Sequence, residues 1–325
     1  MTIESQIRVV FMGSPAFALP SLAGIHTAGY RVVGVYTQTD KPSGRGRSVD
    51  VSAVKQYAVA NGLPVFQPPT LKNKQALADM KLLEPNVLVV AAYGKILPDD
   101  IVNLAPFGCL NVHPSLLPLY RGATPIPAAI LNGDTRTGVS IMMIKPGPVD
   151  SGPVLAQTDV AIDPGDTTGT LTAKLSDIGA DLLVATLHQW LQHQGDAQKM
   201  TPREQDHAKA TFVKLIKKED GKINWELTAR DIWLRVRAYN PWPTAYTHWN
   251  GKLLKILDAE PLNEDTSGNK PGTVVPIKQK AIACGVVTGD GVLGLKMLQA
   301  EGRNATSSVN FINGARDFIG SGLSD

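Results

Sequence analysis

The sequence has very few cysteines and no long hydrophobic run. Only Cys109 and Cys284 occur among 325 residues, which argues against a disulfide-stapled scaffold and predicts a cytoplasmic location. No apolar stretch approaches the roughly 18 residues that a membrane-spanning helix needs. The opening MTIESQIRVVFMG lacks a basic segment followed by a long apolar one, so we expect neither export nor membrane association.

Several motifs of common catalytic and metal sites are also missing. The sequence has no C-x-x-C pair and no histidine-rich cluster, so we expect no bound metal. It has no G-x-S-x-G elbow, and so no sign of a serine nucleophile. The first strand–helix junction, FMGSPAF, contains only Gly13 of the G-x-G-x-x-G fingerprint. A tight turn explains that glycine, which leaves a nicotinamide-dependent dehydrogenase as a minor alternative.

The rest of the composition is that of a globular protein. Hydrophobic residues make up 43% and charged residues 19% of the chain. At roughly 100–200 residues per domain, the length predicts two domains. The net charge of +3 is concentrated in residues 209–325, where basic residues outnumber acidic ones by four. This excess is compatible with an acidic partner such as nucleic acid and with an ordinary solvated surface.

Short apolar runs alternate with helical patterns over residues 1–194. Ser14 and Pro15 are predicted as the N-cap and the first residue of a helix. Strands alternating with helices indicate an α/β fold, a Rossmann-like domain with a mostly parallel sheet covered on both faces. The predicted strands are 7–12, 31–37, 87–92, 109–113, 138–144 and 154–162, and a long helix is predicted over 167–194.

The second part of the chain has a different pattern. Residues 195–208 are polar and lack periodicity, so they are predicted as a linker between a domain at 1–194 and one at 209–325. The second domain combines one helical segment at 228–239 with several short strands separated by turn residues. Asn250-Gly251 is a strong hairpin signal. This pattern predicts a small β-barrel.

Asn111 and His113 are the main candidates for chemistry. They lie two residues apart at the carboxyl end of a predicted strand, so both side chains leave one face where open α/β sheets bind ligands. Cys109 shares that face but lies deeper and is predicted to pack in the core. Asp150, in the loop PGPVDSGP, offers an acid partner, although a simple turn explains an aspartate there equally well. A carboxamide, an imidazole and a carboxylate suit acyl transfer without a covalent enzyme intermediate.

A basic loop follows the second predicted strand. TQTDKPSGRGRSVD at residues 37–50 combines Lys41, Arg45 and Arg47 with two glycines. The glycines predict a mobile loop whose backbone can approach a partner closely. Arginine contacts to phosphate and a solvated basic loop are both compatible with this composition.

Several of these segments occur together in one known family. NVHPSLLPLYRG at 111–122, with DSG at 150–152, resembles the folate-dependent formyltransferases, which move a formyl group from 10-formyltetrahydrofolate to an amine. That motif identifies the superfamily rather than the acceptor. The loop at 37–47, KKEDGKINW at 217–225 and RAYNPWP at 237–243 are similar to the methionyl-tRNA branch of the family. With the opening VVFMGSPAF, the resemblance covers essentially the whole chain.

The resemblance implies a Rossmann-like formyltransferase domain joined to an OB-like barrel that binds tRNA. It implies 10-formyltetrahydrofolate as cosubstrate, initiator methionyl-tRNA as partner, no metal, and a cytoplasmic monomer. Matched by position, the catalytic residues are Asn111, His113 and Asp150, the folate-contacting residues are Ser115, Leu116, Leu117 and Pro118, and the tRNA-contacting residues are Lys41, Arg45 and Arg47.

For the reaction we expect Asn111 and a protonated His113 to stabilise the oxyanion. Asp150 is expected to raise the pKa of His113 and to help remove the amine proton. The sequence departs from the family pattern next to this residue, because Pro148 and Val149 both separate it from Gly147, where one residue is common. The position of Asp150 is therefore the expectation that depends most on the tertiary structure.

Besides the dehydrogenase mentioned above, three alternatives stay open on the sequence. A sugar-nucleotide N-formyltransferase would share the three catalytic residues and a similar second domain, but its small acceptor would not need the loop at 37–50. Deformylation of the folate itself would proceed without any amine. A catalytically inactive tRNA- or folate-binding protein would not need Asn111, His113 and Asp150 together.

Overall fold

The chain folds into two compact units, each built from segments that are distant in sequence. The computed structural model describes residues 3–43, 48–193, 200–264 and 268–324. The first unit consists of Met1–Pro125, Arg136–Ala161 and Thr172–Lys214, and the second of Ile126–Thr135, Ile162–Leu171 and Leu215–Asp325.

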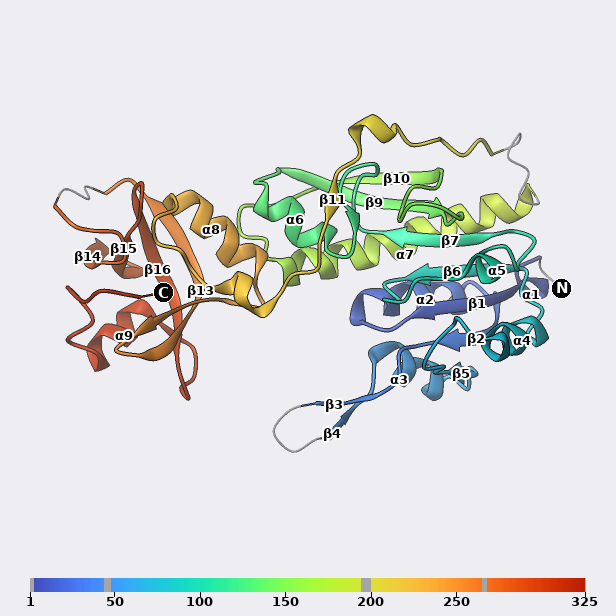
Figure 1. Ribbon diagram of the computed structural model, residues 1–325, viewed down its shortest axis with the longest axis horizontal. Helices are drawn as coiled ribbons and strands as arrows, with labels where there is room; N and C mark the ends of the chain where they lie inside the picture. Colours follow the sequence, from blue (N-terminus) through green and yellow to red (C-terminus); the bar gives the residue numbers. More distant parts are fainter. Residues whose placement is uncertain (1–2, 44–47, 194–199, 265–267, 325) are drawn as a thin grey trace. The chain divides into compact units, whose positions relative to one another are not determined.

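The first unit is built on a seven-stranded sheet with the strand order β10-β9-β7-β6-β1-β2-β5 (Figure 1). The five strands from β7 to β5 in this order are parallel, whereas β9 is antiparallel to both of its neighbours. Every residue of β6 is buried, as a central parallel strand requires. The strands are β1 (Arg8–Gly13), β2 (Arg31–Tyr36), β5 (Val65–Phe66), β6 (Val87–Ala91), β7 (Cys109–His113), β9 (Arg136–Met143) and β10 (Val154–Ala161).

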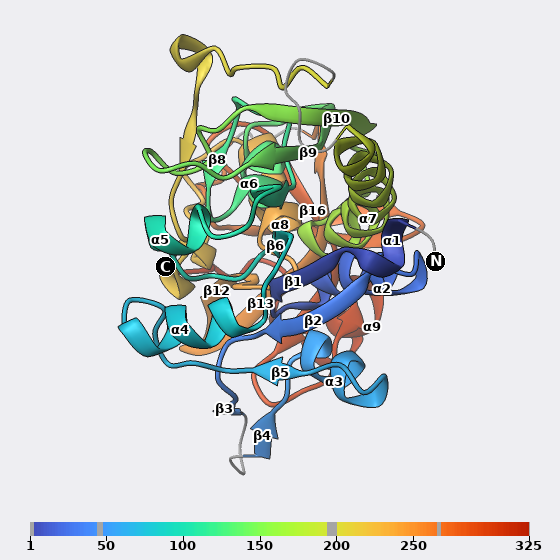
Figure 2. The same cartoon turned by 90° about the vertical axis from the view of Figure 1, so that its right-hand side faces the viewer.

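Helices cover both faces of this sheet, with α4 and α5 on one face and α2 and α7 on the other (Figure 2). Met80 of α4 and Ile101 of α5 pack against Met12, Leu88 and Cys109 from the strands. Asn111 and His113 follow Cys109 by two and four residues, so they lie on this same face of the sheet. The helices are α1 (Ile3–Gln6), α2 (Leu19–Thr27), α3 (Ala53–Ala60), α4 (Lys74–Leu82), α5 (Asp99–Val102) and α7 (Thr168–Gln192).

Two small strand pairs lie outside the main sheet. β3 (Lys41–Ser43) pairs with β4 (Ser48–Asp50), so the ends of the predicted loop at 37–50 form a hairpin. β8 (Arg121–Gly122) pairs in parallel with β11 (Phe212–Val213), so residues just beyond the predicted linker still belong to the first unit, although they were predicted to lie in the second domain.

The second unit contains an antiparallel sheet with the order β12-β13-β16-β15-β14, and β17 pairs with β16. Its core gathers Trp225, Ile256, Leu295 and Phe318. The elements are α6 (Pro125–Leu131), α8 (Ala229–Ala238), β12 (Ala245–Trp249), β13 (Lys252–Leu262), β14 (Val274–Gln279), β15 (Ile282–Val287), β16 (Val292–Ala300), β17 (Thr306–Ser307) and α9 (Ser308–Gly314).

The predicted architecture, a mostly parallel α/β domain followed by a β domain, is confirmed. Asn250 and Gly251 form the predicted two-residue turn, with φ values of 50° and 72° that match a type I′ hairpin. The prediction of Ser14 as an N-cap is wrong. A 3-10 turn (Ala16–Ala18) begins after Pro15 instead. The hydroxyl of Ser14 accepts a hydrogen bond of 2.8 Å from the backbone N–H of Gln38, two residues after the end of β2, and so serves this loop rather than the first turn of the helix. Within the described residues, no helix is both long and apolar enough to cross a membrane.

Candidate active site

Asn111 and His113 lie at the carboxyl end of β7. Both are almost fully buried, at 9% and 3% exposure. β6 and β9 flank them: Asn111 is opposite Val90 and Met142. Cys109 lies deeper on the same face, where burial raises the pKa of its thiol to about 12. A thiol held so far in its protonated form is no nucleophile at neutral pH, in agreement with its predicted place in the core.

The imidazole of His113 lies between a backbone carbonyl and a carboxylate. Its Nε2 is 3.1 Å from the carbonyl oxygen of Tyr120, and its Nδ1 is 3.6 Å from Oδ2 of Asp150. A carbonyl oxygen can only accept, so Nε2 carries the hydrogen in this arrangement. Nδ1 therefore turns its lone pair toward Asp150, which is the position from which it can take up a proton.

The pKa of His113 is lowered from its ordinary value of 6.5, chiefly by burial. The charge of Asp150 and the hydrogen bond to Tyr120 raise it, and the charge of Arg121 lowers it further. The expected effect of Asp150 is thus present, but burial outweighs it. Burial therefore favours the neutral imidazole and acts against the protonated His113 that we expected to stabilise the oxyanion.

Asp150 reaches His113 from the loop between β9 and β10. Its φ is +53°, in the left-handed region that aspartate tolerates better than most residues. Oδ2 accepts a hydrogen bond of 2.9 Å from the backbone N–H of Gly122, so β8 fixes the carboxylate beside the imidazole. The additional residue between Gly147 and Asp150 therefore does not prevent the carboxylate of Asp150 from reaching the imidazole of His113.

Gly122 has little room for a side chain. Its φ is +118°, and a Cβ there would lie 2.4 Å from the carbonyl oxygen of Val213 on β11. We predict that Gly122→Ala lowers the free energy of unfolding by at least about 1 kcal/mol and reduces turnover, since its N–H holds Asp150. Chemical denaturation and a rate assay measure both effects. Gly62→Ala is the matched control, because Gly62 also has a positive φ but no atom within 4 Å of its Cβ position. Equal effects of the two substitutions would contradict the role of the steric contact.

Gln205 is a site residue that the sequence did not single out. It lies in the predicted linker and is 7% exposed. It contacts both the loop that carries Asp150 and the side chain of Arg121 on β8. Its carboxamide nitrogen donates to the carbonyl oxygens of Asp150 at 2.8 Å and Gly152 at 2.6 Å. Its oxygen accepts from Nε and Nη2 of the buried Arg121 at 3.0 and 2.7 Å. No local motif marks this residue, because its partners are 53 to 84 positions away.

The predicted folate-contacting segment is anchored on β9 and β10. Ser140 donates to the carbonyl oxygen of Ser115 at 2.6 Å and accepts from the N–H of Leu117 at 3.1 Å. The amide of Gln157 donates to the carbonyl oxygen of Leu117 at 2.9 Å. The side chains of Ser115 and Leu117 are buried, whereas those of Leu116 and Pro118 are half-buried. Leu116 and Pro118 are thus the members of the segment with side-chain surface left for a ligand.

Of the three predicted tRNA-contacting residues, the structure describes the backbone of Lys41, which is the first residue of β3. Arg45 and Arg47 lie outside the described residues. The base of the hairpin is fixed by Asp40, which forms an ion pair with Lys55 and accepts a hydrogen bond of 2.9 Å from Gln67. Lys55 also donates to Gln67 at 2.7 Å. These contacts hold the point at which the hairpin leaves the sheet.

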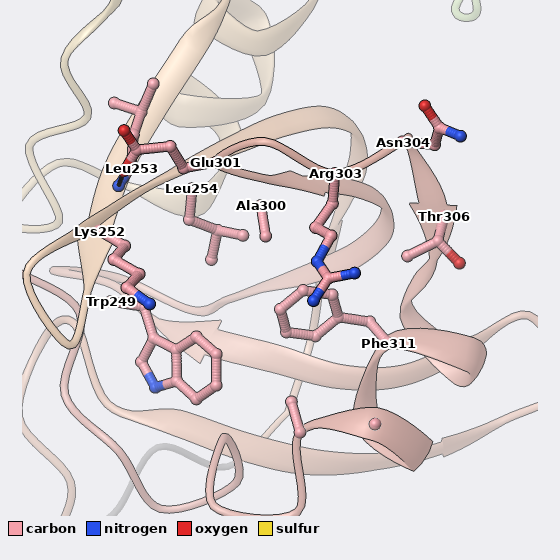
Figure 3. A pocket seen from close by; sticks show the side chains of 12 residues that line it. Trp249, Lys252, Leu253, Leu254, Ala300, Glu301, Arg303, Asn304, Thr306 and Phe311 are labelled. Atoms are coloured by element: carbon pink, nitrogen blue, oxygen red, sulfur yellow. Dashed lines mark hydrogen bonds between the residues drawn. The ribbon is translucent and has the colours of Figure 1, made fainter.

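A hollow of about 510 Å³ lies in the second unit, and none of the candidate active-site residues described above lines it (Figure 3). Trp249 and Phe311 form aromatic walls, and Lys252, Glu301 and Arg303 add charges at its border. Its lining contains no histidine, cysteine or aspartate. In the part of the chain that the structure describes, no group of three or more His, Cys, Asp or Glu side chains gathers as a metal site.

Comparison with known proteins adds the family. A family model described as "Formyl transferase" matches residues 7–187, and one described as "Formyl transferase, C-terminal domain" matches residues 215–316. The methionyl-tRNA formyltransferase of Roseiflexus castenholzii is 46% identical over 311 residues, covering 95% of this chain and 96% of the relative. That of Dehalococcoides mccartyi is 43% identical over 323 residues, covering 99% of both chains.

Solved structures share the fold at lower identity. The sugar 3N-formyl transferase WlaRD has a TM-score of 0.62 at 19% identity, covering 92% of this chain and 99% of its own. HypX from Aquifex aeolicus in complex with tetrahydrofolic acid has a TM-score of 0.62 at 16% identity, covering 97% of this chain and 48% of its own. The full-length agreement with relatives above 40% identity, together with both family models, shows that the chain belongs to the methionyl-tRNA formyltransferase family.

Proposed function

We propose that the protein transfers the formyl group of 10-formyltetrahydrofolate to the α-amino group of methionyl-initiator tRNA. The observation that carries this function is the pairing of His113 with Asp150 on the face of β7 that also bears Asn111. This arrangement supplies a proton acceptor, a charge that stabilises its protonated form, and a carboxamide donor, which together are what a direct acyl transfer needs.

In the first step the neutral amine attacks the formyl carbon. The carboxamide of Asn111, 9% exposed and on the same face of β7 as His113, donates its N–H groups to the developing oxyanion in this proposal. Nδ1 of His113 takes the proton that the amine must lose, and Asp150 stabilises the imidazolium as it forms. The proton then passes from His113 to N10 of the folate as the C–N bond breaks, so the imidazole ends neutral, as it began.

The folate donor is held by the segment from Ser115 to Pro118 in this proposal. Its fixed backbone and the half-buried surfaces of Leu116 and Pro118 form a rigid wall suited to a planar ring. The donor's formyl group would lie toward Asn111 and His113, where the carboxamide of Asn111 fits a carbonyl oxygen.

In this proposal the tRNA is contacted by Lys41, Arg45 and Arg47 of the segment 37–50 and by the basic second part of the chain. The excess of four basic residues over positions 209–325 supports an interaction with phosphates. We propose residues 1–194 as the catalytic domain, 195–208 as the linker and 209–325 as the tRNA-binding domain. We also propose a cytoplasmic monomer, and sedimentation at assay concentrations measures its oligomeric state.

One comparison of acceptors tests the function. The protein is given 10-formyltetrahydrofolate with methionyl-initiator tRNA, with methionyl-elongator tRNA, or with an amino-sugar nucleotide. We expect fast formylation of the initiator tRNA, at least about tenfold slower formylation of the elongator tRNA, and none of the sugar. Preferential formylation of the sugar nucleotide would favour the alternative function, a sugar-nucleotide N-formyltransferase. The amino-sugar nucleotide is included because WlaRD, a sugar 3N-formyl transferase, shares this fold.

A further inference from the structure

The carboxamide of Gln205 uses its full hydrogen-bonding capacity at the edge of the candidate active site. A glutamine offers two N–H donors and one oxygen with two lone pairs. The donors go to the carbonyl oxygens of Asp150 and Gly152, at 2.8 and 2.6 Å. The lone pairs accept from Nε and Nη2 of Arg121. Because Gln205 is almost fully buried, water does not replace any of these partners easily.

The two carbonyl groups belong to the part of the loop that sets the position of the carboxylate. Residues 145–149 of this loop are mostly exposed, and Asp150 has a left-handed backbone. A residue in a sparsely populated conformation keeps it only where its surroundings hold it. Gln205 is a side chain from outside the loop that holds its backbone on both sides of Ser151.

The other two hydrogen bonds restrain a competing charge. Arg121 is 2% exposed, and its guanidinium is held by Gln205 and by Nδ1 of His207 at 3.0 Å. Arg121 adjoins Gly122, whose N–H contacts the carboxylate of Asp150. A guanidinium released at this place would attract that carboxylate away from His113.

We propose that Gln205 is a positioning residue of the transfer reaction, a role that rests on the function proposed above. It holds the backbone of Asp150 and the guanidinium of Arg121 at once, so that the carboxylate stays paired with His113 rather than with the arginine. The segment at 200–214 is then part of the active site as well as the connection to the second unit.

Two substitutions test this role by rate. Gln205→Leu removes all four hydrogen bonds at similar size, whereas Gln205→Glu keeps an acceptor for Arg121 but offers no donor to the two carbonyls. We expect both variants to lower kcat for formylation at least about tenfold, with KM for tRNA and for folate within about threefold. Gln189→Leu, on the exposed side of α7, is the matched control and should keep the wild-type rate. If Gln205→Leu does not fold, the Glu variant decides, because its ion pair with Arg121 preserves the buried contact.

A titration of His113 tests the role of Gln205 in the absence of any formyl-accepting substrate. NMR follows the imidazole C–H signals, and His113→Gln identifies the signal of interest. The charges that face this imidazole are those of Asp150, which raises its pKa, and of Arg121, which lowers it. In Gln205→Leu the carboxylate is displaced toward the arginine, so we expect His113 to titrate at least about half a pH unit lower than in the wild type. The Gln189→Leu control should leave the signal unchanged.

The outcomes separate the two proposals. Wild-type kcat in Gln205→Leu and Gln205→Glu, or an unchanged titration of His113 in Gln205→Leu, overturns the role of Gln205. A wild-type protein that formylates no methionyl-tRNA overturns the proposed function, while the titration still decides whether Gln205 positions Asp150.

Discussion

Replacing Asp150 with asparagine is expected to lower kcat for formyl transfer by about 10²–10⁴-fold. Asparagine has nearly the same shape and adopts the left-handed backbone at φ +53° at least as readily, so the loop should keep its course. Its side-chain oxygen still accepts from the N–H of Gly122. What is lost is the negative charge that stabilises the imidazolium of His113, so the binding of both substrates should change little.

The pH profile checks the cause of this loss. Transfer needs a neutral His113, so kcat/KM in the wild type should fall as the pH drops through the pKa of this residue, below its ordinary value of 6.5. Asp150→Asn removes an interaction that raises this pKa, and the acidic limb should move to still lower pH. Asp159→Asn is the control, because that carboxylate is exposed and paired with Arg136. A near-normal kcat in Asp150→Asn would remove the residue from the mechanism.

Replacing Arg45 with alanine is expected to lower kcat/KM for methionyl-tRNA by about 10–100-fold, the effect of losing a charge-assisted contact to phosphate. Arg45 lies outside the described residues, and the expectation comes from its place in the loop at 37–47. Next to this loop, Asp40 is held by its ion pair with Lys55 and its hydrogen bond from Gln67, both of which Arg45→Ala leaves in place.

Two further measurements separate tRNA contact from general damage. The KM for the folate donor should stay within about twofold, because the catalytic residues are untouched. The slope of log Kd for tRNA against log salt should fall by about one, as expected for one lost phosphate contact. Arg136→Ala, at an exposed position that pairs with Asp159, is the matched control. An unaltered salt dependence in Arg45→Ala would contradict a phosphate contact.

Local patterns predicted most of the fold correctly. The two-residue repeat places Asn111 and His113 on one face of β7, and the alternation of strands with helices indicates a parallel sheet. The hairpin at Asn250-Gly251 follows from the backbone preferences of those two residues. Ser14 shows the limit of such rules, because its hydroxyl accepts from the backbone of Gln38, in the loop after the neighbouring strand β2, instead of capping a helix.

Residue patterns alone were enough to predict the family, the strand that carries Asn111 and His113, and the division into an α/β part and a β part. These features depend on short-range periodicity and on a few contiguous motifs, which can be seen without the folded chain. The tertiary structure decided that Asp150 meets His113, that burial rather than the carboxylate sets the direction of the histidine pKa, and that Gln205 joins the site. Each of these depends on contacts between segments far apart in the chain and on exclusion of water, which no local pattern of residues encodes.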